Sequence, residues 1–309
     1  MTEPAQIDIE PTVRCNLKCP YCQHTFWRRS AEDMSFESFK TILDMIPGLQ
    51  RIKLQGIGEP LLCKDLPLMI GESSRRKIDT FLYTNGTCLN DTTVHAIFEN
   101  GLKEMCISCD HYDPEVLKIL RPGLEFEHYR KGIKKALELS RQSGAKVQAW
   151  SLFTRPLANN FSQFIDFVKD LGFTHVTFQT SLTSWGSAVD ISTFIPSDAE
   201  IASCMAEAKN KNSSEFCVDF SSTNNFDSTN PCLWPFYYSF ISCDGYVQPC
   251  CIISDPGRFT LGNLKKKRFS NIWNSSEMIQ FRRTIQTRRL HDFCKRCYGC
   301  TEKSGVGPT

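Results

Sequence analysis

Short apolar runs alternate with longer helical stretches along the first two thirds of the chain. Each run is rich in apolar residues and ends at Gly, Asn, Asp, Thr or a polar loop, which is typical of β-strands. The stretches between them place apolar residues three and four positions apart, as in helices with one buried face. The predicted strands span residues 6–13, 51–58, 78–86, 104–110, 146–154 and 175–183. The predicted helices include residues 36–46, 92–103, 129–142 and 161–172, and a capping box at Ser197–Glu200 begins another.

The alternation of six strands with helices predicts an α/β fold. Consecutive strand–helix units in one sheet imply parallel strands joined by right-handed crossovers. Six units are too few to close an eight-stranded barrel, so we expect an open, partial (β/α)6 barrel that resembles part of a TIM barrel. In such folds the chemistry lies at the carboxyl ends of the strands.

The pattern changes after about residue 211. From there the sequence is polar and rich in turn residues, and it holds eight of the sixteen cysteines of the chain. We therefore expect two domains. A partial barrel is predicted over residues 1–211, and a smaller, metal-organised, cysteine-rich domain over residues 212–309.

Composition and charge exclude several classes of protein. The chain of 309 residues can bury a full core, and its net charge of +2 gives no general footprint for nucleic acid. No run approaches the roughly 18 apolar residues that span a bilayer, and no apolar stretch near the start suits a signal peptide. We expect a cytoplasmic protein without a nucleic-acid or membrane partner, in a compartment that keeps thiols reduced. Sixteen cysteines in that setting indicate metal binding.

Three cysteines lie close together at the end of the first predicted strand. Cys15, Cys19 and Cys22 have the spacing C-x3-C-x2-C, with no fourth cysteine nearby. A structural zinc site takes four ligands, and a disulfide framework pairs an even number of cysteines. Three thiolates on one short loop suit a four-iron cluster whose fourth iron stays open to another ligand.

Other polar stretches follow the next predicted strands. GIGEP, residues 56–60, follows the second strand, TNG the third, and SCD the fourth. Because the carboxyl ends of parallel strands meet at one mouth of the barrel, we expect these residues to face the three-cysteine loop.

Together these features resemble the radical S-adenosylmethionine (SAM) superfamily, across nearly the whole chain. The family's hallmark is C-x3-C-x2-C with an aromatic residue before the third cysteine, here Tyr21. The resemblance implies that the three cysteines bind a [4Fe–4S] cluster, whose open iron takes the amino and carboxylate groups of SAM. An electron from a flavodoxin- or ferredoxin-like donor would then cleave SAM to a 5′-deoxyadenosyl radical that abstracts a hydrogen atom from substrate.

The resemblance also implies contacts to SAM at the strand ends. GIGEP resembles the family's GGEP element, one residue longer than its shortest form, which holds the methionine amine through Gly58 and Glu59. SCD resembles the family's S-x-D, so that Ser108 and Arg121 would bind the carboxylate, Arg121 by its fork of donors. The implied SAM-binding residues are Tyr21, Gln55, Gly58, Glu59, Asn85, Ser108 and Arg121.

The C-terminal cysteines resemble the auxiliary-cluster extension of this family, called SPASM in its long form and twitch in its short form. Its pattern is C-x(9–15)-G-x4-C, a gap, and C-x2-C, and the text LGN…IWNS lies in the gap here. Since nine residues follow Cys300, ligands for a second auxiliary cluster are not expected. The resemblance implies one auxiliary [4Fe–4S] cluster, bound by Cys232, Cys250, Cys294 and Cys297.

Two alternatives for this extension stay open. Cys251 could replace its neighbour Cys250, and Cys300 extends the last cysteine run. A zinc ribbon could use the C-x2-C pair as one knuckle. Four thiolates would leave an iron–sulfur cluster without an open iron, so that it would carry electrons rather than bind substrate.

Three reactions are compatible with these motifs, and an electron carrier is not, because a carrier has no use for an open iron. The resemblance favours dehydrogenation of an alcohol on a small polar substrate, such as a sugar, aminocyclitol or nucleoside. Asp110 or His111 would be the base, and the auxiliary cluster the electron acceptor. Epimerisation is the second reaction, with Cys251 as hydrogen-atom donor, and peptide modification by a maturase is the third.

Candidate substrate contacts come from the later strands. Trp150, Arg155 and Gln179 are placed to point into the barrel there. We expect a small-molecule substrate because only fourteen residues precede Cys15, which leaves no room for a domain that binds a peptide leader.

Overall fold

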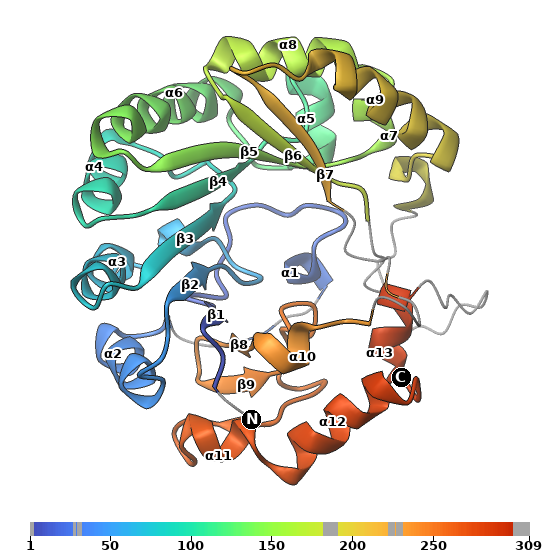
Figure 1. Cartoon of the computed structure of the whole chain (residues 1–309). Coiled ribbons are helices and arrows are strands. Elements are labelled where there is room, and N and C mark those ends of the chain that lie inside the picture. The colour runs from blue at the N-terminus through green and yellow to red at the C-terminus, as the bar shows by residue number, and fades with distance from the viewer. Residues whose placement is uncertain are drawn as a thin grey trace.

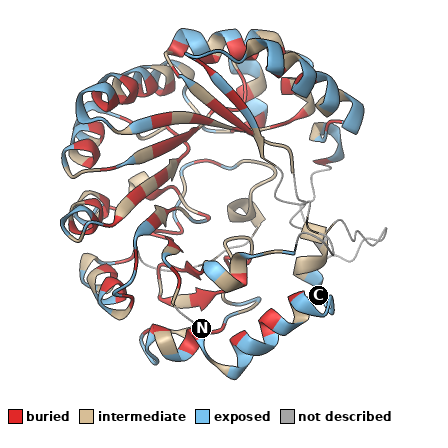
Figure 2. Ribbon diagram, viewed as in Figure 1, coloured by how far each residue is buried: buried red, intermediate tan, exposed pale blue. Residues whose placement is uncertain are grey.

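The strands form because alternate residues are apolar and pack against helices, while the residues between them face the other side of the sheet. The computed structural model describes residues 3–26, 29, 33–181, 191–221, 226 and 231–298. Ile7, Ile52 and Leu82 are fully buried in the core between sheet and helices. Figure 2 shows the buried positions along the strands and on the inner sides of the surrounding helices. The other strand face carries polar side chains into the concave interior.

Seven parallel strands build the barrel part of the sheet. They are β1 (Gln6–Ile9), β2 (Arg51–Leu54), β3 (Asp79–Thr84), β4 (Glu104–Ser108), β5 (Lys146–Leu152), β6 (His175–Gln179) and β7 (Cys217–Ser221). The six predicted strands and the open, partial barrel are confirmed. The sheet curves around a central space, with helices along its outer side (Figure 1).

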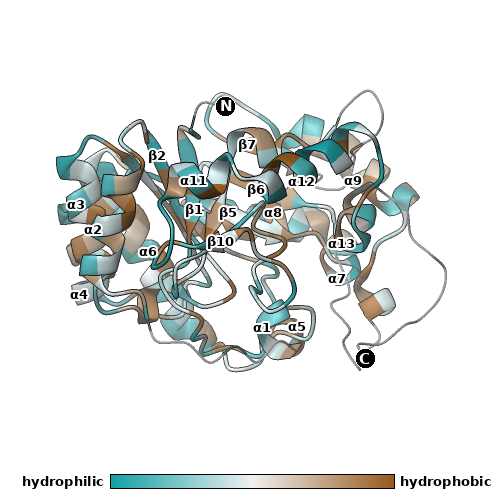
Figure 3. Cartoon of the chain, turned by 90° about the horizontal axis from the view of Figure 1, so that it is seen from below, coloured by the Kyte–Doolittle hydropathy of each residue, from teal (hydrophilic) through white to brown (hydrophobic). Residues whose placement is uncertain are grey.

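The crossover helices present one apolar side to the sheet. They are α2 (Phe36–Met45), α3 (Leu66–Arg75), α4 (Asp91–Glu99), α5 (Pro114–Leu120), α6 (Phe126–Ser143), α7 (Arg155–Ala158), α8 (Phe161–Leu171) and α9 (Asp198–Lys211), with 3-10 turns at Pro60–Leu62 and Ile191–Phe194. Figure 3 shows hydrophilic and hydrophobic residues side by side on α2 and α3. Helix α9 begins at the predicted capping box, since the hydroxyl of Ser197 accepts the backbone N–H of Glu200.

Strand β7 differs from the prediction, which began the second domain at residue 212. It pairs in parallel with β6 and extends the barrel to Ser221. The sequence hides this strand because Cys217 and Asp219, on one of its faces, are exposed rather than buried, and polar segments flank it. Burial on one face only gives a weak apolar signal in a strand of five residues.

The C-terminal segment joins the opposite edge of the same sheet. Its elements are α10 (Trp234–Tyr237), β8 (Phe240–Ile241), β9 (Tyr246–Gln248), β10 (Gly262–Asn263), α11 (Phe269–Trp273), α12 (Ser276–Gln286), α13 (Asp292–Lys295) and a 3-10 turn at Arg296–Tyr298. Strand β8 pairs in parallel with β1, which gives the strand order β10-β9-β8-β1-β2-β3-β4-β5-β6-β7. This segment is therefore continuous with the barrel through the sheet.

A buried ion pair ties the three-cysteine region to the C-terminal segment. Arg29 donates to the carboxylate of Glu10 at 2.7 Å and to that of Asp244 at 3.1 Å. The same guanidinium donates to the backbone oxygen of Ser254 at 3.0 Å. Burial raises the pKa of Glu10, and the neighbouring Arg29 opposes that rise.

In the described residues, no helix has the length and apolar character needed to cross a membrane.

Candidate active site and auxiliary cluster site

A pocket of about 400 Å³ opens at the carboxyl ends of the strands. The three cysteines of the first loop line it. So do all seven residues that the sequence assigns to SAM: Tyr21, Gln55, Gly58, Glu59, Asn85, Ser108 and Arg121. The parallel strands bring these residues together although 100 positions separate Tyr21 from Arg121, because each strand ends at the same mouth.

The three-cysteine loop is packed directly against the GIGEP turn. A Cβ atom at Gly58 would lie 2.3 Å from the carbonyl oxygen of Thr12 and 2.7 Å from that of Arg14, so only glycine fits. The backbone N–H of Glu59 donates to the same Arg14 oxygen at 2.7 Å. Beyond the loop, Cys22 leads into the short helix α1 (Gln23–Phe26), which lies on the inner side of the barrel (Figure 1).

The sulfur atoms of this loop suit a metal cluster chemically. Burial raises the pKa of Cys19 to about 12, and it also raises the pKa of Cys15 and of Cys22. Free thiolates are therefore unfavourable here, whereas coordination to iron would supply the missing positive charge. Arg121, which also lines the pocket, lowers the pKa of all three thiols.

Glu59 braces the end of β3. Its Oε1 accepts hydrogen bonds from the Thr84 hydroxyl at 2.6 Å and from its own turn. Its Oε2 accepts the backbone N–H of Asn85 at 2.6 Å. Burial raises the pKa of this carboxyl, and these donors lower it. The side chain thus holds the GIGEP turn and the TNG stretch together at the wall of the pocket.

Arg121 lines the pocket and forms a buried ion pair with Asp110. Its Nε and Nη2 atoms lie 2.6 and 2.5 Å from Oδ2 of Asp110, which also accepts the Tyr21 hydroxyl at 3.1 Å. The other oxygen, Oδ1, accepts the backbone N–H of Leu152 at 2.8 Å. Fork geometry of this kind fixes the plane of a guanidinium.

These contacts differ from the prediction that Asp110 or His111 is a base. Both oxygens of Asp110 are occupied, and Asp110 does not line the pocket. Both nitrogens of His111 have partners as well, the Pro156 carbonyl oxygen at 3.4 Å and the Asp113 backbone N–H at 3.0 Å. The sequence places both residues near the mouth, but only the fold shows that they are turned to neighbouring loops.

The three predicted substrate contacts lie in different places. Gln179 lines the pocket, and Trp150 donates its indole N–H to the Gln179 side-chain oxygen at 3.3 Å. Arg155 instead bonds the Ile195 carbonyl oxygen at 2.6 Å and lies 3.7 Å from Glu200. The sequence did not predict several residues that line the pocket: Gln23, Tyr83, Leu152, Ser181, Phe240, Ile252 and Ser254. Tyr83 could have been found, because it lies two positions before Asn85 and therefore on the same side of the chain as that residue.

The adjacent residues Cys250 and Cys251 line different cavities. Cys251 lines the pocket at the carboxyl ends of the strands, together with the three-cysteine loop. This pocket is called the SAM-side pocket below. Cys250 lines a second cavity, together with the other predicted ligands Cys232, Cys294 and Cys297. Cys250, rather than Cys251, thus belongs to the predicted auxiliary set. Cys300 lies outside the described residues.

Apolar and aromatic side chains close the second cavity. Ile253, Phe281 and Phe293 line it, and the rings of Phe281, His291 and Phe293 lie nearly parallel, with centroids 5.0–6.2 Å from one another. Burial raises the pKa of Cys232 to about 11 and that of Cys294 to about 12. As in the first site, metal coordination would remove the cost of a buried thiolate.

The donor set of the second cavity fits an iron–sulfur cluster. Cys232, Cys250, Cys294 and Cys297 all line this cavity. A four-iron cluster with no open iron takes one thiolate on each of its four irons, which is the number of cysteines present here.

Comparison with known proteins matches both halves of this arrangement. Residues 9–147 match the model of the radical SAM superfamily, and residues 232–298 match the SPASM model, an iron–sulfur cluster-binding domain. The PqqA peptide cyclase of Granulibacter bethesdensis is 23% identical over 305 residues, which cover 95% of this chain and 79% of that protein.

Two solved structures have the same fold. SuiB of Streptococcus suis bound to S-adenosylmethionine is 17% identical with a TM-score of 0.74, over 98% of this chain and 75% of that one. BtrN in complex with AdoMet and 2-DOIA is 19% identical with a TM-score of 0.58, over 94% of this chain and 91% of that one. The domain matches imply [4Fe–4S] clusters and SAM as cofactors. The chain belongs to the radical SAM superfamily and carries a SPASM iron–sulfur cluster-binding domain after its partial barrel.

Proposed function

We propose that the protein is a radical SAM epimerase, which inverts a carbon centre of a small polar substrate with Cys251 as the hydrogen-atom donor. Cys15, Cys19 and Cys22 would hold the first cluster, and Gly58, Glu59, Ser108 and Arg121 would be among the residues that hold SAM. When bound, these cofactors supply a 5′-deoxyadenosyl radical that removes a hydrogen atom from the substrate.

One observation carries this proposal: Cys251 lines the SAM-side pocket, while Cys250 lines the auxiliary cavity. A thiol in the wall of the pocket can return a hydrogen atom to a carbon radical. Because the C–H bond can form on the other face of that carbon, the product differs from the substrate only in configuration. Inversion needs this donor and no general base.

Dehydrogenation, which the sequence favours, needs a group that takes the hydroxyl proton. Asp110 and His111 are occupied by other partners, as described above. Among the described residues that line the pocket, Glu59 is the sole carboxylate, and three donors occupy it. The geometry therefore supports inversion over oxidation.

Hydrogen-atom transfer from Cys251 has to be followed by reduction of its sulfur. Its S–H bond breaks, the new C–H bond forms on the substrate, and a thiyl radical remains on the sulfur. One electron and one proton restore the thiol, and a flavodoxin- or ferredoxin-like protein is the proposed external electron donor. Burial raises the pKa of Cys251, so the sulfur keeps the hydrogen that it must give.

The lining of the pocket supports a substrate that carries hydroxyl or amino groups. Besides the residues assigned to SAM, Gln23, Gln179 and Ser254 line the pocket together with Cys251 and supply neutral donors and acceptors. A sugar, an aminocyclitol or a nucleoside matches these groups. The similarity to a peptide cyclase makes a peptide the competing substrate class in the test.

The test is product analysis in D2O with anaerobically reconstituted protein, SAM, a one-electron reductant, and panels of aminocyclitols, sugars, nucleosides and short peptides. An inverted product that gains one deuterium supports the proposal, because the Cys251 thiol exchanges with solvent. We expect Cys251→Ala to lose this product and still to form 5′-deoxyadenosine. Cys204→Ala, which removes a thiol outside both cavities, should retain the product. A product two mass units lighter would contradict inversion, and turnover of peptides alone would contradict the substrate class.

A further inference from the structure

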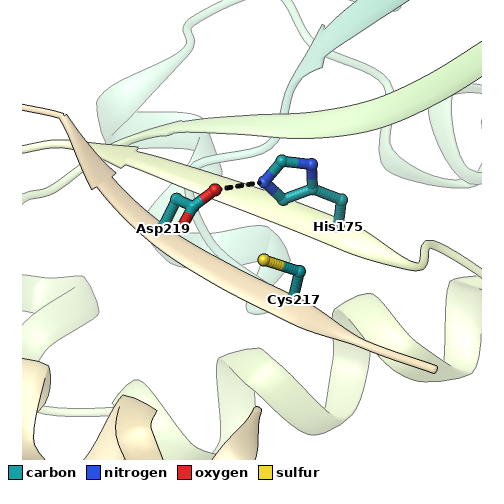
Figure 4. Close-up of side chains that lie close together, drawn as sticks. All are labelled: His175, Cys217 and Asp219. Carbon is teal, nitrogen blue, oxygen red and sulfur yellow. Dashed lines mark hydrogen bonds and ion pairs between the residues drawn. The ribbon is translucent and has the colours of Figure 1, made fainter. Parts of the chain in front are cut away.

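Three side chains with metal-binding atoms gather at the amino ends of β6 and β7. A nitrogen of His175, the sulfur of Cys217 and a carboxylate oxygen of Asp219 all lie within 4.8 Å of one another. Figure 4 shows the three side chains converging, His175 from β6 and the other two from β7. In the part of the chain that the structure describes, this is the one such group.

The parallel register of the two strands fixes this arrangement. His175 lies opposite Cys217, and Asp219 follows two residues later on the same face of β7. The ligand atoms are therefore carried by two hydrogen-bonded strands, which position side chains better than loops do. His175 and Gln179 share one face of β6, so about 13 Å of strand separates this group from the SAM-side pocket.

A cavity of about 630 Å³ adjoins the group. His175 and Cys217 line it, and polar or charged residues of neighbouring strands line it as well, among them Glu104, Lys146 and Gln148. The cavity gives solvent and solutes access to the ligand atoms at the end of the barrel opposite the active site. Its walls leave room for a ligand that the protein does not supply.

We propose that His175, Cys217 and Asp219 bind a divalent cation of the zinc class, with the fourth coordination position open to the cavity. Imidazole nitrogen, thiolate sulfur and carboxylate oxygen together match the borderline character of Zn²⁺, which takes four ligands in tetrahedral geometry. Without metal, Nε2 of His175 and Oδ2 of Asp219 share a hydrogen bond of 2.9 Å. The Thr177 hydroxyl lies 3.4 Å from the same nitrogen.

The cation would link the last two strands of the barrel. Among the described strands, β7 is the last of the sheet and pairs with β6 alone. A metal bridge from His175 to Cys217 and Asp219 would hold this strand to β6 by side chains as well as by the backbone ladder. The proposal does not depend on which reaction the SAM-side pocket performs.

The experiment uses the full-length protein with both iron–sulfur clusters reconstituted, so that the cluster cysteines are occupied. After incubation with Zn²⁺ and desalting, we expect about one zinc per chain, with one sulfur at about 2.3 Å and the remaining ligands at about 2.0–2.2 Å in zinc-edge X-ray absorption. Zinc bound at a vacated cluster site would instead show several sulfurs. Zinc should also raise the unfolding temperature of the protein.

Substitution of each proposed ligand tests whether the zinc is bound by these three residues. We expect Cys217→Ser to lose the sulfur from the zinc shell, and Asp219→Asn or His175→Gln to weaken zinc binding at least tenfold. Cys204→Ala, a thiol outside the group, should bind zinc as the wild-type protein does. Iron content and circular dichroism verify that each variant is folded. Absence of zinc from the cluster-loaded protein, or a sulfur-rich zinc shell that the variants leave unchanged, would overturn the proposal.

Discussion

The two cysteine-lined cavities of this protein differ in the residues that line them. The SAM-side pocket is lined by both polar and apolar residues, and its polar wall is braced by charged side chains such as Glu59 and the Arg121–Asp110 pair. The auxiliary cavity is walled by Ile253, Phe281 and other apolar residues around its four cysteines. The cysteines are alike, so the difference lies in what surrounds them.

This difference corresponds to what each cluster has to do. A cluster with an open iron must share its pocket with a charged cofactor and a substrate, and these need donors and acceptors held in fixed positions. A cluster whose irons all carry thiolates binds neither. An apolar shell around it excludes water and sets its reduction potential. The polar wall is thus expected to control ligand binding, and the apolar wall electron transfer.

The largest effect should come from removing the ligands of one cavity at a time. We expect the Cys15/Cys19/Cys22→Ala variant to lower the iron content from about eight to about four per chain and to abolish SAM cleavage. The Cys232/Cys250→Ala variant should also lose about four irons, yet still form some 5′-deoxyadenosine, because the open-iron site is intact. Iron and sulfide analysis with product chromatography measures both. Iron content of about four falling to none in the first variant, with zinc present, would contradict two clusters.

The next effect concerns the buried ion pair of the polar wall. Arg121→Ala leaves the carboxylate of Asp110 buried without its cation, so we expect a loss of about 3–5 kcal/mol in the free energy of unfolding. The variant should also bind SAM much more weakly. Asp110→Asn keeps the shape of the side chain and leaves the guanidinium in place, and both losses should be smaller. Denaturant unfolding and SAM titration separate the two effects, and unchanged SAM affinity in folded Arg121→Ala would contradict the assigned role.

A third effect arises inside the barrel, beneath the polar wall. Asp8 on β1 is fully buried. Its Oδ2 accepts the side-chain N–H of Gln55, and its Oδ1 has no hydrogen-bond partner among the described residues. Burial raises the pKa of this carboxyl from 3.8 to about 6, against the opposing effects of Lys53 and Gln55. The folded state therefore holds the proton more tightly than the unfolded state, and stability falls as the pH rises from about 4 through 6.

Asp8→Asn should remove this pH dependence. At pH 7.5 we expect the variant to unfold with a free energy up to about 3 kcal/mol greater than that of the wild-type protein, since each unit of pKa corresponds to about 1.4 kcal/mol. At pH 5 the difference should be about 1–2 kcal/mol, because the wild-type carboxyl is then largely protonated in the folded state. Urea unfolding at the two pH values measures it. A difference that does not change with pH would mean that Asp8 is not the titrating group.

Most residues of the polar wall could be predicted from the sequence, but few of their hydrogen-bond partners could. Most residues of the SAM-side pocket could be grouped because they lie at or just after the end of a strand, and the ends of parallel strands share one mouth. Arg121, which follows α5, was assigned by the family resemblance instead. The partners of Asp110 could not be foreseen, because they depend on how the loop after β4 meets β5 and Arg121. The same holds for Cys250 and Cys251, where the local turn alone decides which cavity each thiol lines.

The smallest expected effect concerns the packing of the GIGEP turn against the three-cysteine loop. Two glycine substitutions, one in this contact and one outside it, form a matched pair. Gly58→Ala places a methyl group against the backbone oxygens of Thr12 and Arg14, neither of which can move as a side chain can. We expect a loss of about 1–3 kcal/mol in the free energy of unfolding and weaker SAM binding, since the three-cysteine loop must shift. Gly48→Ala meets no atom within 4 Å and should be neutral or slightly stabilising. Thermal unfolding and SAM titration compare the two. If Gly58→Ala behaves as Gly48→Ala does, the close packing of the GIGEP turn on the cluster loop is not what holds the open-iron site in shape.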